Sequence, residues 1–120
     1  MSFPQPALSP PCPVAEKDWV IEKEGRHPQL GRVIDVYWDE IDQEWLIDIE
    51  LYSPDGRLIG RESDALGGPE DFEPAVPMRH WSRIAKPVFP MKRDRTGYRD
   101  WRDAAEILGP RTAARQGGEG

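Results

Sequence analysis

Apolar and polar residues alternate along the middle of the chain, between residues 31 and 62. In residues 45–52 every second position is apolar, and these positions are Trp45, Ile47, Ile49 and Leu51. The positions between them are Leu46, Asp48, Glu50 and Tyr52. Successive side chains of a β-strand point to opposite faces of the sheet, so this alternation predicts a half-buried strand. Another strand is predicted at residues 32–38, with Ile34, Val36 and Trp38 on one face and Val33, Asp35 and Tyr37 on the other.

Turn-forming residues separate the predicted strands. In Ser53-Pro54-Asp55-Gly56, proline presets φ, aspartate can bond the backbone and glycine can take a positive φ. This combination predicts a type I turn with a G1 bulge, followed by an antiparallel strand at residues 57–62. Gly60 indicates a bulge or bend within that strand.

Two further strands are predicted nearer the ends of the chain. Residues 19–24 form the first, and Gly25 and Pro28 place a loop at residues 25–30. Residues 78–85 are predicted to form a short helical turn that leads into the last strand. Together the segments predict a mainly β fold, either a small bent antiparallel sheet or a barrel of four to five strands. Rolling the sheet into a barrel would remove its exposed edges.

This arrangement resembles the SH3-like small β-barrel superfamily, of the Tudor and KOW types. The resemblance is one of architecture, and it implies a closed barrel without implying one particular activity. The segments that carry it are residues 19–24, 31–38, 45–52, 57–62 and 81–85.

The flanking segments have a different composition. Residues 1–15 are predicted to be a flexible Pro-rich arm, and residues 16–86 the barrel-like domain. Residues 87–109 are predicted to be an extended basic segment with a short α-helix at residues 98–108, and residues 110–120 a disordered tail. The apolar face of that helix would comprise Tyr98, Trp101, Ala105 and Leu108, and Gly109-Pro110 would end it.

Composition and charge narrow the class of protein. The 120 residues include one cysteine, Cys12, so an internal disulfide is excluded and a reducing, cytoplasmic location is expected. No apolar run is long enough to span a bilayer, so no membrane partner is predicted. The net charge is −6, but residues 1–85 carry 8 Lys/Arg and 17 Asp/Glu, whereas residues 86–120 carry 8 and 5. An acidic body with a basic tail is predicted, and this asymmetry concerns partners more than fold.

No catalytic, cofactor or metal site is predicted. His27, His80 and Cys12 are isolated from one another in the sequence. The carboxylates of residues 39–44 lack the spacing and the glycine of a calcium-binding EF-hand loop, and solvated acids of a hairpin loop explain them. The strand acids Asp35, Asp48 and Glu50 could support acid–base chemistry, but exposed acids that face lysine or arginine are the ordinary explanation.

The leading hypothesis is a non-enzymatic protein–protein interaction module or adaptor, because aromatic residues are abundant and no catalytic set is present. The alternative is a nucleic-acid binding module that uses the basic and aromatic C-terminal segment. Another possibility is an aromatic cage for a methylated cation, built from two or more of Tyr37, Trp38, Tyr52 and Trp81, although most of these rings could instead belong to the core. The long loop at residues 63–77 holds Phe72, either as a plug in the core or as an anchor for a partner. The predicted partner-binding residues are Phe72, Lys92, Arg93, Arg95, Tyr98, Arg99, Trp101 and Arg102.

Overall fold

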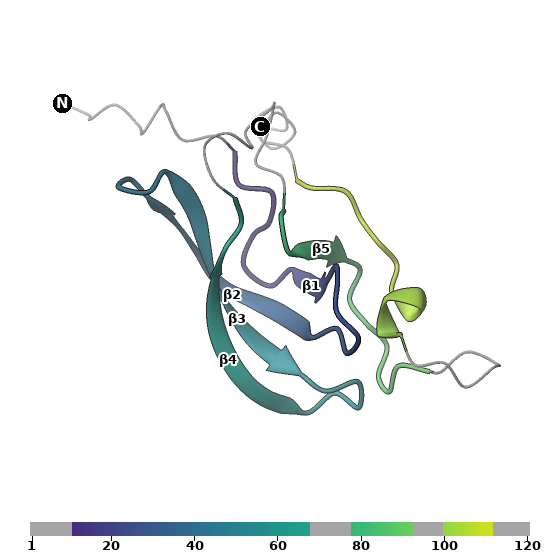
Figure 1. Ribbon diagram of the computed structural model, residues 1–120. Helices are drawn as coiled ribbons and strands as arrows, with labels where there is room; N and C mark the ends of the chain where they lie inside the picture. Colours follow the sequence, from purple (N-terminus) through teal and green to yellow (C-terminus); the bar gives the residue numbers. More distant parts are fainter. Residues whose placement is uncertain (1–10, 68–77, 93–99, 112–120) are drawn as a thin grey trace, which may run out of the picture.

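The computed structural model describes residues 11–67, 78–92 and 100–111, which form a mainly β fold. The strands are β1 (Trp19–Glu22), β2 (Leu30–Asp39), β3 (Glu44–Tyr52), β4 (Leu58–Ala65) and β5 (Trp81–Ile84). They make one open antiparallel sheet in the order β4-β3-β2-β1-β5 (Figure 1). The prediction of a small antiparallel sheet of four to five strands is confirmed.

β3 buries the face that its alternating sequence predicted. Ile47 and Ile49 are fully buried, Leu51 is nearly so, and Trp45 packs against them at the edge of the same cluster. This first core cluster also contains Val14, Val20, Val33, Leu66, Met78 and Trp81. Burial of apolar surface contributes about 25 cal/mol per Å², so the branched and aromatic residues of this face supply much of the stability of the sheet.

The predicted faces of β2 are wrong on one side of a β-bulge. The register against β3 shifts between Val33 and Asp35, so Ile34 is an extra residue in β2. The extra residue reverses the alternation, and Val33 and Val36 therefore pack against the same core cluster. A bulge also bends its strand and increases the local twist, and β2 and β3 curve together along their length (Figure 1).

The turn between β3 and β4 forms as predicted. The amide of Gly56 donates to the carbonyl of Ser53 at 2.8 Å, and Gly56 has a φ of +95°. The amide of Ser53 donates to the carbonyl of Arg57 at 2.8 Å. The register shift that follows makes Ile59 the extra residue of β4, immediately before the glycine at which an irregularity was predicted.

A second core cluster lies on the opposite face of β1. It contains Trp19, Ile21, Leu30, Ile84 and Met91, and Tyr52, Phe89, Trp101 and Ala105 pack against it. The Phe89 ring lies 5.8 Å from the ring of Trp19 and 6.4 Å from that of Tyr52. We call residues 85–92 and 100–111 the C-terminal strap. Because its side chains pack against this cluster, the strap belongs to the folded structure.

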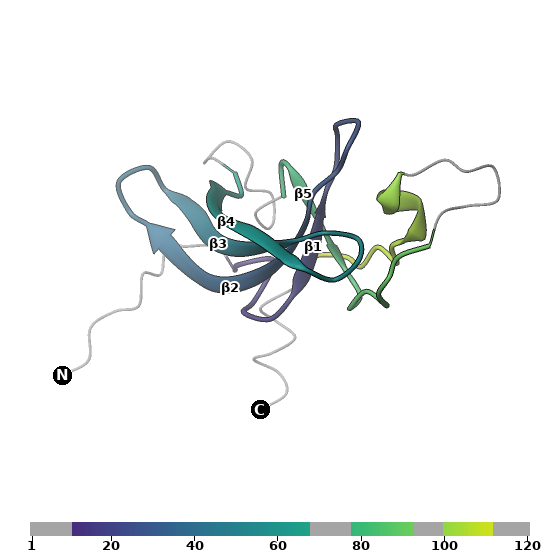
Figure 2. The ribbon, with the colours of Figure 1, turned by 90° about the horizontal axis from the view of Figure 1, so that it is seen from below.

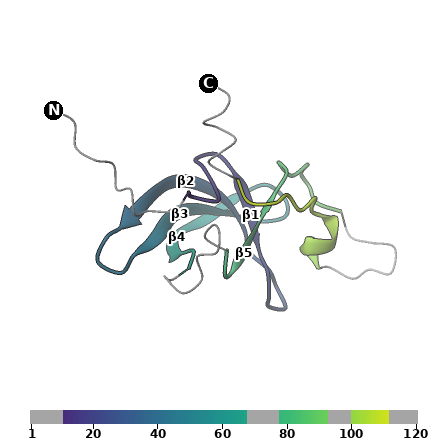
Figure 3. The same ribbon diagram turned by 90° about the horizontal axis from the view of Figure 1, so that it is seen from above.

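The predicted C-terminal α-helix is not seen. The described residues of the strap contain instead a 3₁₀ turn, η2 (Trp101–Ala104). Beyond this turn Ile107 forms a β-bridge with Ile84, and the amide of Ala85 donates to the carbonyl of Glu106 at 2.9 Å. The backbone groups that would have bonded within a helix thus extend the sheet beside β5, and the strap continues past β1 and β5 (Figure 3).

The ends of the molecule differ in structure. The β2–β3 hairpin forms one end, and the η2 turn of the strap lies at the other (Figure 2).

Residues 79–80 form bends before β5 rather than the predicted helical turn. Within the predicted Pro-rich arm, residues 11–15 are described, and Val14 is buried in the first core cluster. In the part of the chain that the structure describes, no helix has the length and apolarity needed to traverse a bilayer.

Candidate functional site

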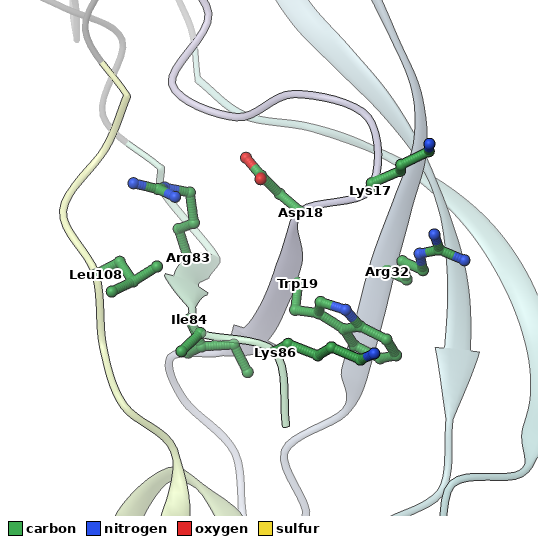
Figure 4. Close-up of a pocket in the computed structure, with 9 residues that line it drawn as sticks. Lys17, Asp18, Trp19, Arg32, Arg83, Ile84, Lys86 and Leu108 are labelled. Atoms are coloured by element: carbon green, nitrogen blue, oxygen red, sulfur yellow. The ribbon is translucent and has the colours of Figure 1, made fainter. Parts of the chain in front are cut away.

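A pocket of about 420 Å³ opens between the start of β1 and the strap. Four of its lining side chains are cationic: Lys17, Arg32, Arg83 and Lys86. We call it the cationic pocket. Its other side chains include the indole of Trp19 and the carboxylate of Asp18. Figure 4 shows Lys17, Arg32 and Lys86 around Trp19, with Arg83 on the side of the pocket near Leu108.

Strand register brings these residues together. Trp19 of β1 is paired with Arg32 of β2 on one side and with Ile84 of β5 on the other. Paired residues of neighbouring strands point to the same face, so Arg32 lies beside the indole. The chain then leaves β5 through Ala85, and the side chain of Lys86 extends along the indole of Trp19 (Figure 4).

Lys17 reaches the pocket through an unusual backbone conformation. Its φ is +79°, which lies in the left-handed region that side chains other than glycine rarely adopt. Its amide donates to the carbonyl of Val33 at 2.7 Å, and that of Asp18 donates to the carbonyl of Ala15 at 3.1 Å. These bonds hold the strained turn, and strain of this kind is concentrated at functional sites.

The carboxylate of Asp18 is already engaged. Arg111 donates from Nε to Oδ2 and from Nη2 to Oδ1, both at 2.7 Å. Partial burial acts to raise the pKa of Asp18, but the hydrogen bonds from Arg111 and from the Ala15 amide, with the charges of Arg111 and Arg83, lower it overall. Asp18 therefore stays ionised and is matched by a cation of the strap, so it neutralises little of the charge of the pocket.

Two of the four cations have no ionic partner among the residues that the structure describes. Among the described residues, no salt bridge or hydrogen bond occupies the ammonium of Lys17 or that of Lys86. The Nε of Arg83 donates to the carbonyl of Gly109 at 2.9 Å, which is a neutral partner. The cationic pocket therefore presents an excess of positive charge beside an aromatic ring, within a chain whose net charge is −6.

The strand acids that could have formed an acid–base pair are engaged by neighbours. Asp48 accepts from Tyr37 at 3.2 Å and from Ser63 at 2.6 Å. Glu50 accepts from the hydroxyl of Tyr52 at 3.1 Å and forms a 3.4 Å ion pair with Arg61. Glu50 thus faces an arginine, as expected for an exposed strand acid, whereas the partners of Asp48 are hydroxyl groups.

Of the predicted partner-binding residues, three are described. Lys92 is exposed and lines a second pocket, and Trp101 is half-buried against the second core cluster. Arg102 donates to the carbonyls of Lys23 (2.6 Å) and Gly25 (2.7 Å). Arg102 thus fastens the strap to the loop after β1. The other predicted residues, Phe72, Arg93, Arg95, Tyr98 and Arg99, lie outside the described residues.

The residues considered for an aromatic cage are dispersed. Trp81 is buried in the first core cluster and donates to Asp64 at 2.7 Å. Trp38 packs against Trp45, with ring centroids 5.4 Å apart, and Tyr52 packs against Trp19 at 5.1 Å. These rings stabilise the sheet and do not surround a common space.

An acidic cluster lies in the β2–β3 hairpin, far from the cationic pocket. Carboxylate oxygens of Asp39, Asp42 and Glu44 lie within 4.8 Å of one another. Asp39 Oδ1 accepts from the amides of Ile41 at 3.0 Å and Asp42 at 3.3 Å, so part of this cluster orders the turn itself. Asp42 is exposed and the other two acids are half-buried, an arrangement compatible with a solvated loop.

No local sequence pattern indicates the cationic pocket. Its cations come from the turn before β1, from β2, from β5 and from the strap, and only strand pairing brings them together. Comparisons of the chain with protein-family models, with curated proteins and with solved structures found no match. The geometry of the pocket is therefore the basis for a functional proposal.

Proposed function

We propose that this protein is a non-enzymatic protein–protein interaction module that binds an acidic segment of its partner in the cationic pocket. The observation that carries the proposal is the excess of cations around Trp19. Carboxylates that enter the pocket would meet Lys17 and Lys86, which form no ion pair within the described part of the chain. Opposite charges in a partly enclosed space attract more strongly than on an open surface, because less water screens them.

The proposed fold of the module concerns the place of the cationic pocket in the sheet. We propose that the bent sheet is an SH3-like barrel, and the pairing of β5 with β1 next to β2 is consistent with it. In such a barrel the residues at the end of β5 and the start of β1 would lie at one rim. The cationic pocket, which lies at the start of β1 and the end of β5, would then belong to this rim.

A nucleic-acid binding module is the second candidate. The cations of the pocket could also bind a phosphate, and the face of Trp19 could stack against a base. The same sheet face, however, carries Asp35, Asp48 and Glu50 across β2 and β3. A nucleic acid carries a negative phosphate at every nucleotide, so a strand bound in the pocket would extend toward these carboxylates and be repelled by them. A short acidic peptide segment can occupy the pocket without reaching them. The charge pattern therefore favours a protein partner.

The experiment is a peptide-display selection on the immobilised full-length chain. We expect enrichment of peptides rich in aspartate and glutamate. Synthetic versions should bind at least about tenfold more weakly to the double variant Arg32→Gln/Lys86→Gln, which corresponds to about 1.4 kcal/mol. The matched control is Lys23→Gln/Arg26→Gln, which removes the same charge from an exposed loop outside the pocket.

The two candidates give different results in a parallel titration. A fluorescent single-stranded oligonucleotide should show no binding at micromolar protein if the partner is a protein. Binding of the oligonucleotide that weakens steeply with salt, together with no peptide enrichment, would replace the proposal with the nucleic-acid alternative. Equal peptide affinities for the pocket variant and the control variant would refute the assignment of the site.

A further inference from the structure

The tip of the β2–β3 hairpin exposes an apolar side chain between acids. Ile41 is 91% exposed, and its neighbours in the turn are Glu40 and Asp42. The hydrogen bonds from the Ile41 and Asp42 amides to Asp39 fix the turn. Covering this exposed isoleucine with another surface would remove its apolar area from water, which favours association. The tip therefore combines the features of a ligand: a fixed backbone, negative charge and one apolar side chain.

A complementary surface exists at the other end of the molecule. A second pocket of about 430 Å³ lies between residues 84–92 and the η2 region of the strap. We call it the apolar pocket, because its lining includes Pro87, Val88, Pro90, Met91 and Ala104. Val88 is 84% exposed.

The cationic pocket and the apolar pocket adjoin. Ile84, Ala85 and Lys86 line both of them, so an apolar group and a carboxylate of one ligand can be bound side by side. The charged residues of the apolar pocket are Lys86, Lys92 and Glu106, which leaves two cations against one acid. This surface accordingly matches an apolar side chain flanked by acids.

We propose that the acidic segment bound by the two pockets is the β2–β3 hairpin tip of a second copy of this chain, an inference that rests on the proposed function of the cationic pocket. Ile41 enters the apolar pocket, and the flanking carboxylates of Glu40 and Asp42 face Lys86 and the cationic pocket. The tip lies at one end of the molecule and the η2 turn, which contributes Ala104 to the apolar pocket, lies at the other (Figure 2), so the contact is head-to-tail. A head-to-tail contact leaves one tip and one pair of pockets free, so association continues to rings or open chains.

The contact area of a hairpin tip is small, so the association is weak. We expect a monomer at low micromolar concentration and a mass that increases with concentration toward millimolar protein. Salt should oppose the association because charges contribute to it. Sedimentation velocity on the full-length chain at low and high salt measures both effects.

Complementation between two variants tests the head-to-tail geometry. Ile41→Ser removes the apolar side chain of the tip, and Arg32→Gln/Lys86→Gln weakens the pockets. Each variant alone should remain monomeric at concentrations where the unmodified chain associates. An equimolar mixture should form a heterodimer and nothing larger, because one intact tip meets one intact pair of pockets. The control is Ile59→Ser, which removes an exposed isoleucine (59% exposed) from β4 and should leave association unchanged.

The outcomes separate this inference from the proposed function. A chain that stays monomeric at millimolar concentration, while acidic display peptides still bind the cationic pocket, overturns the second-copy inference alone. Failure of both measurements overturns both proposals. Association that survives in each variant, or that Ile59→Ser abolishes, assigns the contact to another surface and also overturns the inference.

Discussion

Arg111 forms a bidentate ion pair with Asp18, with two N···O distances of 2.7 Å. The pair connects the end of the described strap to the turn before β1, which are far apart in the sequence. The amide of Arg111 also donates to the carbonyl of Pro13 at 2.9 Å. The side chain of Asp18 is only 9% exposed, so this is a better shielded pair than most ion pairs on a surface.

Replacing Asp18 with asparagine should lower the free energy of unfolding by about 1–3 kcal/mol, the usual effect of losing a charged hydrogen-bond partner. The folded-state pKa of Asp18 lies below its ordinary value of 3.8, so its contribution is present above that value and is lost as the pH falls through the lower folded-state pKa. The stability difference between the unmodified chain and Asp18→Asn should therefore shrink as the pH is lowered from neutral to below 3.8. Urea titrations across this range measure it, and a constant difference would contradict the prediction.

Gly56 lies against the ring of Phe89. A Cβ at this position would be 2.9 Å from Cγ of Phe89, and the φ of +95° also disfavours other residues. Gly56→Ala should destabilise the protein by about 1–3 kcal/mol from overpacking, in addition to the backbone strain. Gly25→Ala is the matched control, because Gly25 has a φ of +108° but open space around its Cβ.

The two glycine variants can be compared by thermal unfolding. The difference between their effects isolates the contact with Phe89, since both include the strain of a positive φ. A Phe89→Ala background removes the 2.9 Å contact with Cγ but keeps Cβ, which would lie 3.1 Å away, so Gly56→Ala should have a smaller effect there than in the unmodified chain. An unchanged effect in that background would show that the strap does not pack against the turn.

Much of the sheet was predictable because its determinants are local. The alternation in β3 and the turn at residues 53–56 each specify a structure within a few residues. The bulge at Ile34 was not predictable, because it depends on the register between β2 and β3. The C-terminal helix was predicted wrongly because spacing alone does not show that Glu106 and Ile107 pair with the edge of β5.

Lys17 is predicted to lower the stability of the folded chain while it strengthens the binding of acidic peptides. Lys17→Gly should raise the free energy of unfolding by about 0.5–1 kcal/mol, because glycine relieves the left-handed strain but has more backbone entropy to lose. The same change should weaken binding of acidic peptides severalfold. Gln43→Gly, at a φ of +55° in the β2–β3 hairpin, is the control, and it should raise stability without altering peptide binding. Calorimetric titration with a display-selected peptide, alongside urea unfolding, measures both quantities.

Cys12 is predicted to be an unreactive thiol in the folded chain. Burial is the main cause that raises its pKa from 9.0 to about 11, and the negative charge of Asp18 adds to this effect. The thiolate is the reactive form, so two pKa units reduce its fraction near neutral pH about a hundredfold. Reaction with a disulfide reagent at pH 8 should be slower in the folded chain by about this factor than in guanidinium-unfolded chain. Comparable rates in the two states would show that Cys12 is accessible and ionised.

The strap carries one wall of each pocket, through Lys86 and Leu108 in one and through Met91 and Ala104 in the other. A fragment trimmed after the last strand would keep all five strands and still lack a binding surface. It would also bare the rings of Trp19 and Tyr52 to water, since Phe89 shields them. Shortened versions of this protein should therefore retain residues through Arg111 if recognition is to be measured rather than aggregation.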